Sequence, residues 1–161
     1  MLNSESEVSY DAGTESEDEI IERAMQILQR RFDSLEQLNS SAKSAEYLVM
    51  RYREHKHEVF GVIYLDQQHQ VLALEELFTG TIDGCAVYPR RVVEGLIKHG
   101  AAKVLIFHNH PSGYPKPSKA DISITEKLVA ALGTISAQVL DHLVLGAGRS
   151  YSFAEHGDAG L

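Results

Sequence analysis

Residues 104–121 read Val-Leu-Ile-Phe-His-Asn-His-Pro-Ser-Gly-Tyr-Pro-Lys-Pro-Ser-Lys-Ala-Asp. The first four are apolar, which is typical of a short central strand covered on both faces. The proline-rich stretch 111–117 can form neither a helix nor a central strand, so it predicts a loop. Ser118 then predicts the start of a helix that runs to about Leu132. This order places two histidines at the end of a strand and an aspartate in the first turn of the next helix.

These three side chains have the pattern of metal ligands. His108 and His110 are separated by one residue, so they leave the same face of the strand, roughly 6.5–7 Å apart along it, and can lean onto one ion. Asp121 shares an inward stripe with Ile124 and Leu128, and a carboxylate that faces a core needs a partner such as a bound cation. Three protein ligands leave a fourth tetrahedral position for water, as in catalytic zinc sites. We therefore predict one Zn2+ ion; nickel, cobalt and iron remain open as alternatives.

Ser118 and Asp121 also fit a helix cap. A serine at the cap accepts a hydrogen bond from an amide three residues on, and an acidic residue in the first turn suits the helix dipole. Capping accounts for these two residues but not for the histidines. The two interpretations are compatible, because Ser118 can order the turn that delivers Asp121.

The rest of the chain predicts an α/β (α+β) fold. The apolar run 58–66 and residues 71–78 predict an antiparallel hairpin. Pro89 and Gly100 have the positions expected at the start and just beyond the end of a helix. The remaining expected elements are helices over 18–32 and 42–53, and strands over 139–145 and 151–153 joined by a turn at 146–148.

Length and charge predict one folded domain behind an acidic tail. The chain has 161 residues, of which 43% are hydrophobic. Residues 1–19 hold seven acidic side chains and no Lys or Arg, whereas the rest holds 15 basic and 16 acidic side chains. We expect a disordered tail over 1–17, a helix and linker over 18–38, and the main domain over 39–161. The nearly neutral body offers no broad basic stripe, so direct nucleic-acid binding is not expected.

Cysteine content and hydropathy bear on the compartment. Cys85 is the only cysteine, which excludes an internal disulfide and a cysteine-rich zinc site. The apolar stretches are shorter than a membrane span, and the acidic N-terminus does not have the pattern of a signal peptide. The expectation is a cytoplasmic protein without a membrane partner.

The spacing from His108 to Asp121 resembles the JAMM motif, H-x-H-x7-S-x2-D, of the MPN+ (JAB) metallopeptidases. The segments 77–81, 87–90, 141–144 and 152–155 look like the RadC branch of that family, and the resemblance covers about 39–161. It implies a curved mixed sheet flanked by helices, similar to cytidine deaminases, although the deaminase H-x-E and P-C-x-x-C signature is missing. The chain looks like a short form, with an acidic tail and one helix in place of an N-terminal helix-hairpin-helix module.

The resemblance implies zinc-dependent hydrolysis of a peptide or isopeptide bond by a metal-activated water, with a peptide or protein as substrate. Glu58, in Glu-Val-Phe-Gly-Val-Ile, is similar to the family's E-h-h-G-h-h pattern, which implies a general base that later acts as an acid. Glu75 and Glu76 are rivals without the following glycine. The Ser118 hydroxyl, with the zinc, is expected to stabilise the tetrahedral oxyanion.

Other interpretations remain open. Because the RadC family carries a DNA-repair label, the chain is alternatively a DNA-repair or mobile-element accessory protein that acts by binding, with a structural or vestigial metal site. Zinc also serves phosphoester hydrolysis, but a single-metal ligand set makes a nuclease less favoured. His142 is either a structural residue or a hydrogen-bond partner of a metal ligand. The sequence makes no prediction of oligomeric state.

Overall fold

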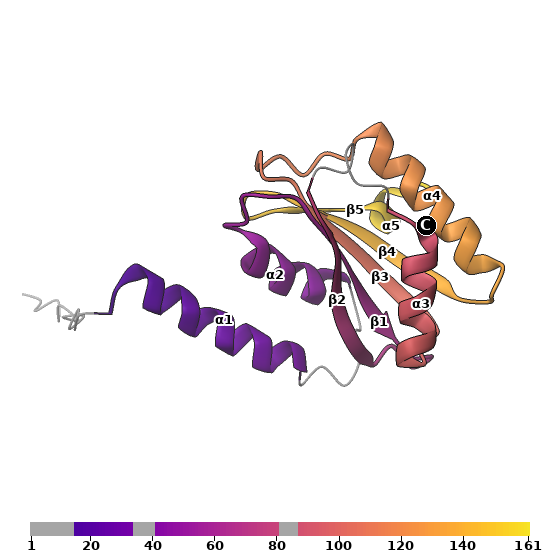
Figure 1. Ribbon diagram of the computed structural model, residues 1–161. Coiled ribbons are helices and arrows are strands. Elements are labelled where there is room, and N and C mark those ends of the chain that lie inside the picture. The colour runs from indigo at the N-terminus through magenta and orange to yellow at the C-terminus, as the bar shows by residue number, and fades with distance from the viewer. Residues whose placement is uncertain (1–14, 34–40, 81–86) are drawn as a thin grey trace, which may run out of the picture.

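A computed structural model describes residues 15–33, 41–80 and 87–161. Its five strands form one sheet in the order β2-β1-β3-β4-β5, in which β3 and β4 are parallel and the other neighbours are antiparallel (Figure 1). The elements are α1 (Glu17–Asp33), α2 (Ser41–Tyr52), β1 (Val59–Leu65), β2 (Val71–Thr79), α3 (Pro89–His99), β3 (Lys103–Asn109), α4 (Lys119–Gly133), β4 (Gln138–Leu145), β5 (Ser150–Ser152) and α5 (Phe153–His156). The predicted mixed sheet flanked by helices is confirmed.

Helices cover both faces of this sheet. Figure 1 shows α2 on one side and α3 with α4 on the other. Every residue of β1 is buried, and so is β3 after its first residue, because both strands lie between two layers of helices. The two faces of the sheet carry separate apolar clusters, one around α2 and one around α3 and α4.

The central strands approach each other closely at Gly61. A Cβ atom there would lie 2.1 Å from Cζ of Phe107, so only glycine leaves room for that ring. Phe107 is itself fully buried in the core on the α2 side. The residue that follows it, His108, therefore turns to the opposite face of the sheet, toward α4.

The helix boundaries follow the predicted signals. Pro89 is the first residue of α3, and Gly100 ends it in the left-handed conformation with φ of 63°. Ser118 caps α4, where its side chain accepts a hydrogen bond from the amide of Asp121. The predicted strand over 151–153 is partly wrong, because β5 ends at Ser152 and Phe153 begins the short helix α5. The reason is a local cap, in which the Ser152 hydroxyl accepts from the amide of Glu155.

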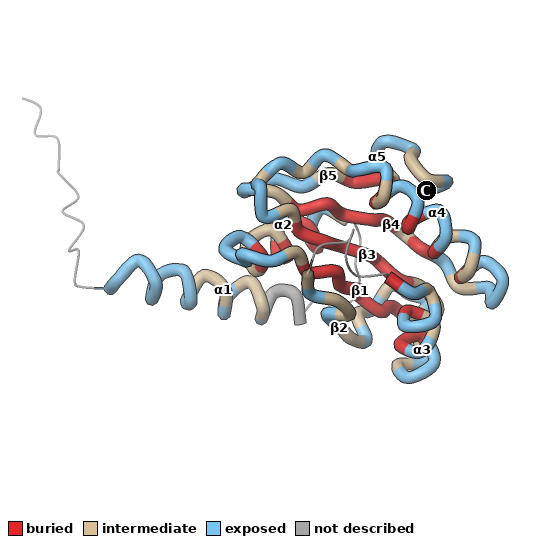
Figure 2. Tube along the Cα trace, turned by 45° about the horizontal axis from the view of Figure 1, so that its top comes forward, coloured by how far each residue is buried: buried red, intermediate tan, exposed pale blue. Residues whose placement is uncertain are grey.

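The N-terminal helix is longer by one residue at each end than the predicted range 18–32. Figure 2 shows α1 extending from the body of the fold with much of its length exposed. Ile20 and Ile21 of this helix are both exposed. Leu28 packs against the cluster on the α2 side of the sheet. No helix of the described ranges is long and apolar enough to cross a membrane. The predicted tail lies outside the described residues up to residue 14, as do residues 34–38 of the predicted linker and Cys85.

Candidate metal centre

Four side chains from three parts of the fold converge at one point. They are Glu58 just before β1, His108 and His110 at the end of β3, and Asp121 in the first turn of α4, and each offers a ligand atom within 4.8 Å of the others. Nε2 of His108 lies 2.9 Å from Nε2 of His110 and 3.3 Å from Oδ1 of Asp121. Nε2 of His110 lies 3.5 Å from Oδ2 of the same carboxylate.

Two of these three separations have the length expected between ligands of a tetrahedral metal ion, and the 2.9 Å between the two histidine nitrogens is shorter. Two ligand atoms that each lie about 2.0–2.1 Å from such an ion are about 3.3–3.4 Å apart. The two contacts from the histidines to Asp121, at 3.3 and 3.5 Å, match this value. Nδ1 of His110 donates to the carbonyl oxygen of Tyr114 at 2.9 Å, because that oxygen can only accept. In the neutral ring, Nε2 of His110 therefore presents a lone pair to the cluster, as a metal ligand must.

The charge distribution also favours a cation. Burial would raise the pKa of Asp121, but hydrogen bonds and positive charge from His108 and His110 in their protonated forms together outweigh burial and hold this pKa well below its usual range. The Asp121 carboxylate in turn raises the pKa of His110, against the opposing effect of burial. Burial lowers the pKa of His142 well below its usual value, so this ring is neutral at physiological pH. The cluster thus holds an ionised, buried carboxylate beside imidazoles, a set of N and O donors that suits a borderline-soft divalent ion.

Glu58 is distinguished from its two rivals by position. Its Oε1 lies 4.0 Å from Nε2 of His108, farther than the closer donors are from one another, and 14% of its side chain is exposed. Glu75 instead contacts Lys98 and His99 on α3, at 2.6 and 2.7 Å. Glu76 accepts a hydrogen bond from the hydroxyl of Tyr52 on α2 at 2.6 Å. The structure therefore brings Glu58 into the cluster and leaves the glutamates of β2 outside it.

Comparison with known proteins places the chain. Residues 38–158 match the family model of the RadC-like JAB domain. The chain belongs to this family. Its curated relatives include UPF0758 proteins of Xanthomonas axonopodis pv. citri (45% identical over 138 residues, 83% of this chain and 61% of the relative), Cellvibrio japonicus (52% over 120 residues, 74% and 54%) and Azotobacter vinelandii (44% over 138 residues, 86% and 62%). The chain spans about three fifths of the length of these relatives. Their names state no activity.

The structure also brings a residue next to the candidate metal centre that the sequence did not indicate. Asn109 lies between the two histidines, is 3% exposed and points to the opposite face of β3. Its Oδ1 accepts from the amide of Val59 at 2.6 Å, and its Nδ2 donates to the carbonyl of His57 at 3.1 Å. These two bonds fix the backbone on both sides of Glu58. The only indication in the sequence was that Asn109 is a polar residue at the end of the otherwise apolar strand β3.

Ser118 borders the cluster without being part of it. Its backbone amide donates to Oδ2 of Asp121 at 2.6 Å, and its Oγ accepts from the Asp121 amide at 3.1 Å. This reciprocal cap holds the carboxylate of Asp121 in place, so the capping and metal interpretations of the pair are compatible in the structure. The residue itself is exposed. A hydroxyl that accepts from an amide keeps its own hydrogen for another partner.

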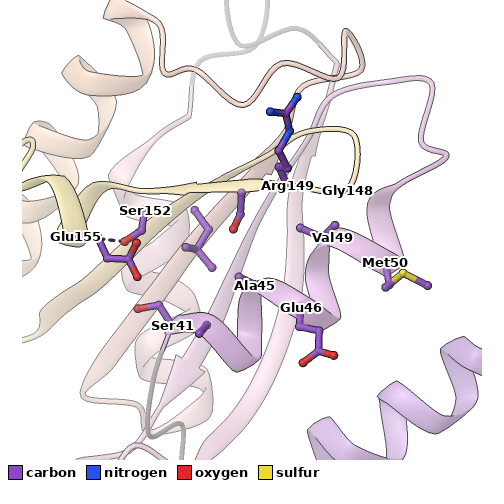
Figure 3. A pocket seen from close by; sticks show the side chains of 12 residues that line it. Ser41, Ala45, Glu46, Val49, Met50, Gly148, Arg149, Ser152 and Glu155 are labelled. Carbon is purple, nitrogen blue, oxygen red and sulfur yellow. Dashed lines mark hydrogen bonds between the residues drawn. The ribbon is translucent and has the colours of Figure 1, made fainter.

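A separate hollow of about 460 Å³ lies on the α2 face of the sheet (Figure 3). Ala45 and Val49 of α2 form one wall, and Gly148 and Arg149 of the turn before β5 form another. None of its lining residues belongs to the four side chains of the candidate metal centre, which lies on the face covered by α4. The hollow is therefore separate from the candidate metal centre.

Proposed function

We propose that this chain is a zinc-dependent hydrolase that cleaves an amide bond, peptide or isopeptide, in a peptide or protein. The single observation that carries the proposal is the convergence of Glu58, His108, His110 and Asp121, with three close donors and one carboxylate set slightly apart. Membership of the RadC-like JAB domain family supports the same reaction class. We propose the same activity for the longer relatives, whose names state none.

His108, His110 and Asp121 would hold the ion. When bound, zinc supplies a Lewis acid and lowers the pKa of a coordinated water toward about 7. Three protein donors leave a coordination position for that water, as catalytic zinc sites require.

Glu58 is the proton carrier of the proposed reaction. A carboxylate oxygen of Glu58 accepts a proton from the water as the water oxygen forms a bond to the carbonyl carbon of the substrate. The same proton then passes to the amide nitrogen as the C–N bond breaks, so a carboxyl group and an amine leave. Asn109 holds the backbone that carries this carboxylate. The Ser118 hydroxyl donates to the carbonyl oxygen while negative charge develops on it.

The test compares Glu58→Gln with Glu75→Gln. Both replace a carboxylate by its amide, but only Glu58 lies in the cluster. The purified proteins are loaded with zinc, analysed for bound metal, and incubated with a library of peptides and isopeptide-linked peptides, with and without a chelator such as EDTA. We expect equal zinc content in the unaltered chain and in both variants, and a loss of turnover of about 10²–10⁴-fold in Glu58→Gln alone.

Two results would contradict the proposal. One is turnover that survives removal of the metal. The other is turnover by Glu58→Gln at the rate of the unaltered chain. A protein that binds zinc but cleaves nothing in the library would favour a role in binding, with the metal as a structural element.

A further inference from the structure

His142 connects two of the metal-binding elements through the interior of the fold. It lies on β4, is fully buried, and its Nε2 is 2.8 Å from Nδ1 of His108. Its Nδ1 is 2.6 Å from Oγ1 of Thr125 on α4, which is also fully buried. The Thr125 hydroxyl in turn lies 2.6 Å from the backbone carbonyl oxygen of Asp121. The hydrogen bonds therefore link β3, β4 and α4 in one chain.

The end of this chain sets the direction of every hydrogen in it. The carbonyl of Asp121 can only accept, so the single hydrogen of the Thr125 hydroxyl points to it, and Oγ1 accepts from Nδ1–H of His142. A neutral imidazole carries one hydrogen, so Nε2 of His142 must accept, and Nδ1–H of His108 donates to it. Nε2 of His108 then has a lone pair, and this is the atom that faces His110 and Asp121.

We propose that His142 and Thr125 are positioning residues that fix the metal-binding tautomer of His108. The inference rests on the metal-binding part of the proposed function and adds to it. We call the hydrogen-bonded chain His108–His142–Thr125–Asp121 the relay. It begins at the His108 ring and ends at the backbone carbonyl of Asp121. The side chain of Asp121 faces Nε2 of His108, so the relay and the metal centre together form a closed ring. One set of hydrogen bonds thus orients a ligand from β3 relative to a ligand from α4.

Aromatic packing holds the relay in one orientation. The ring of His142 stacks on Phe153, with centroids 4.8 Å apart and planes 17° apart. Phe60 meets it edge-on at 5.9 Å and 73°. A reversed relay would send the Thr125 hydrogen to His142 and would place a hydrogen on Nε2 of His108, where it blocks the metal. Because Thr125 already has a carbonyl acceptor, the structure favours the metal-binding direction.

The test uses Thr125→Val, which keeps the shape of the side chain and removes the hydroxyl, with Thr125→Ser as the matched control. The first measurement is the nitrogen NMR spectrum of histidine-labelled, metal-free protein at mildly alkaline pH, which identifies the protonated nitrogen of each ring. We expect His108 and His142 to carry their hydrogens on Nδ1 in the unaltered chain and in Thr125→Ser. In Thr125→Val we expect a mixture of tautomers at His142 and His108.

The second measurement is zinc affinity, by competition with a coloured chelator. Loss of an outer hydrogen-bond partner typically weakens metal binding 10–100-fold, so we expect a loss of about that size in Thr125→Val and little change in Thr125→Ser. Denaturant unfolding of the metal-free proteins shows whether Thr125→Val is folded. If it is not, His142→Gln serves instead, because an amide oxygen can still accept from His108 and should retain more affinity than His142→Ala.

The relay is refuted if His108 carries its hydrogen on Nε2 in the unaltered chain, or if folded Thr125→Val binds zinc as tightly as Thr125→Ser. The tautomers are read without metal, so they test the relay even in a protein that cleaves no peptide. Conversely, normal peptidase activity with an unchanged tautomer in Thr125→Val would refute the relay and leave the hydrolase proposal in place.

Discussion

Replacing Asp121 by Asn separates metal binding from helix capping at the same residue. The asparagine oxygen can still accept the hydrogen bond from the Ser118 amide, now 2.6 Å from Oδ2 of Asp121. The amide nitrogen would then stand near Oδ1, 3.3 Å from Nε2 of His108, and would donate to the lone pair that should bind the ion. The cap survives, whereas a charged ligand is lost and a neighbouring ligand is blocked.

The expected size of the effect follows from linkage. Loss of an outer partner of a metal ligand costs 10–100-fold in affinity, so loss of the ligand Asp121 should cost more than about 100-fold. In zinc at about 1,000 times the dissociation constant, the unaltered chain gains about 4.1 kcal/mol in the free energy of unfolding. At the same zinc concentration, a hundredfold weaker site gains only about 1.4 kcal/mol. Ser118→Ala should do the reverse, with a loss of about 0.5–2 kcal/mol without metal and a nearly unchanged gain from zinc.

The assay is urea unfolding of the three proteins with and without zinc, combined with a direct zinc titration. Comparing the two variants identifies the role of each residue. Asp121→Asn should keep the helix cap and lose stabilisation by zinc, whereas Ser118→Ala should lose the cap and keep stabilisation by zinc. Our interpretation is refuted if Asp121→Asn gains as much from zinc as the unaltered chain does. It is also refuted if Ser118→Ala loses that gain to the same extent, since capping and metal binding would then not be separate roles of the two residues.

Three further predictions address the supports of the centre and its pH dependence. Asn109→Ala should retain zinc but lose about 10²-fold in peptide turnover, because a general base displaced by about 1 Å costs that much; unchanged turnover of a peptide from the library would contradict this. Gly61→Ala should lower the free energy of unfolding by about 1–3 kcal/mol or more, because its Cβ would lie 2.1 Å from the ring of Phe107. Gly133→Ala, with nothing within 4 Å of its Cβ, is the control in the same urea experiment and should not destabilise. Zinc binds the neutral form of His110, whose pKa is raised by the carboxylate beside it, so affinity should fall as pH drops through that raised value; zinc titrations that are independent of pH down to about 5 would contradict this.

The local pattern of the chain predicted most of the elements, and it singled out three of the side chains that converge in the candidate metal centre. Asp121 shares its helical stripe with Ile124 and Leu128, and all three are buried as the 3.6-residue period requires. Glu58 could not be separated from Glu75 and Glu76 by periodicity. Its family pattern favoured it, and the packing of β1 against β3 places it beside His108.

The sequence left two roles open for His142 and did not indicate Asn109, because the contacts of both residues depend on the register between strands. His142 meets His108 only because β4 runs parallel to β3 with Ile106 opposite His142. Asn109 reaches Val59 across the antiparallel pairing of β1 and β3. A sequence pattern shows which face a residue takes within its own strand, but not which residue of the neighbouring strand lies beside it.

X-ray absorption spectroscopy at the zinc edge, on protein loaded with one equivalent of zinc, reports the ligands of the bound ion. We expect one ion per chain in a four-coordinate shell of two imidazole nitrogens and two oxygens, at about 2.0–2.2 Å. The same spectrum should change in His110→Ala. A shell that lacks imidazole, or one that is unaltered in that variant, would contradict this expectation.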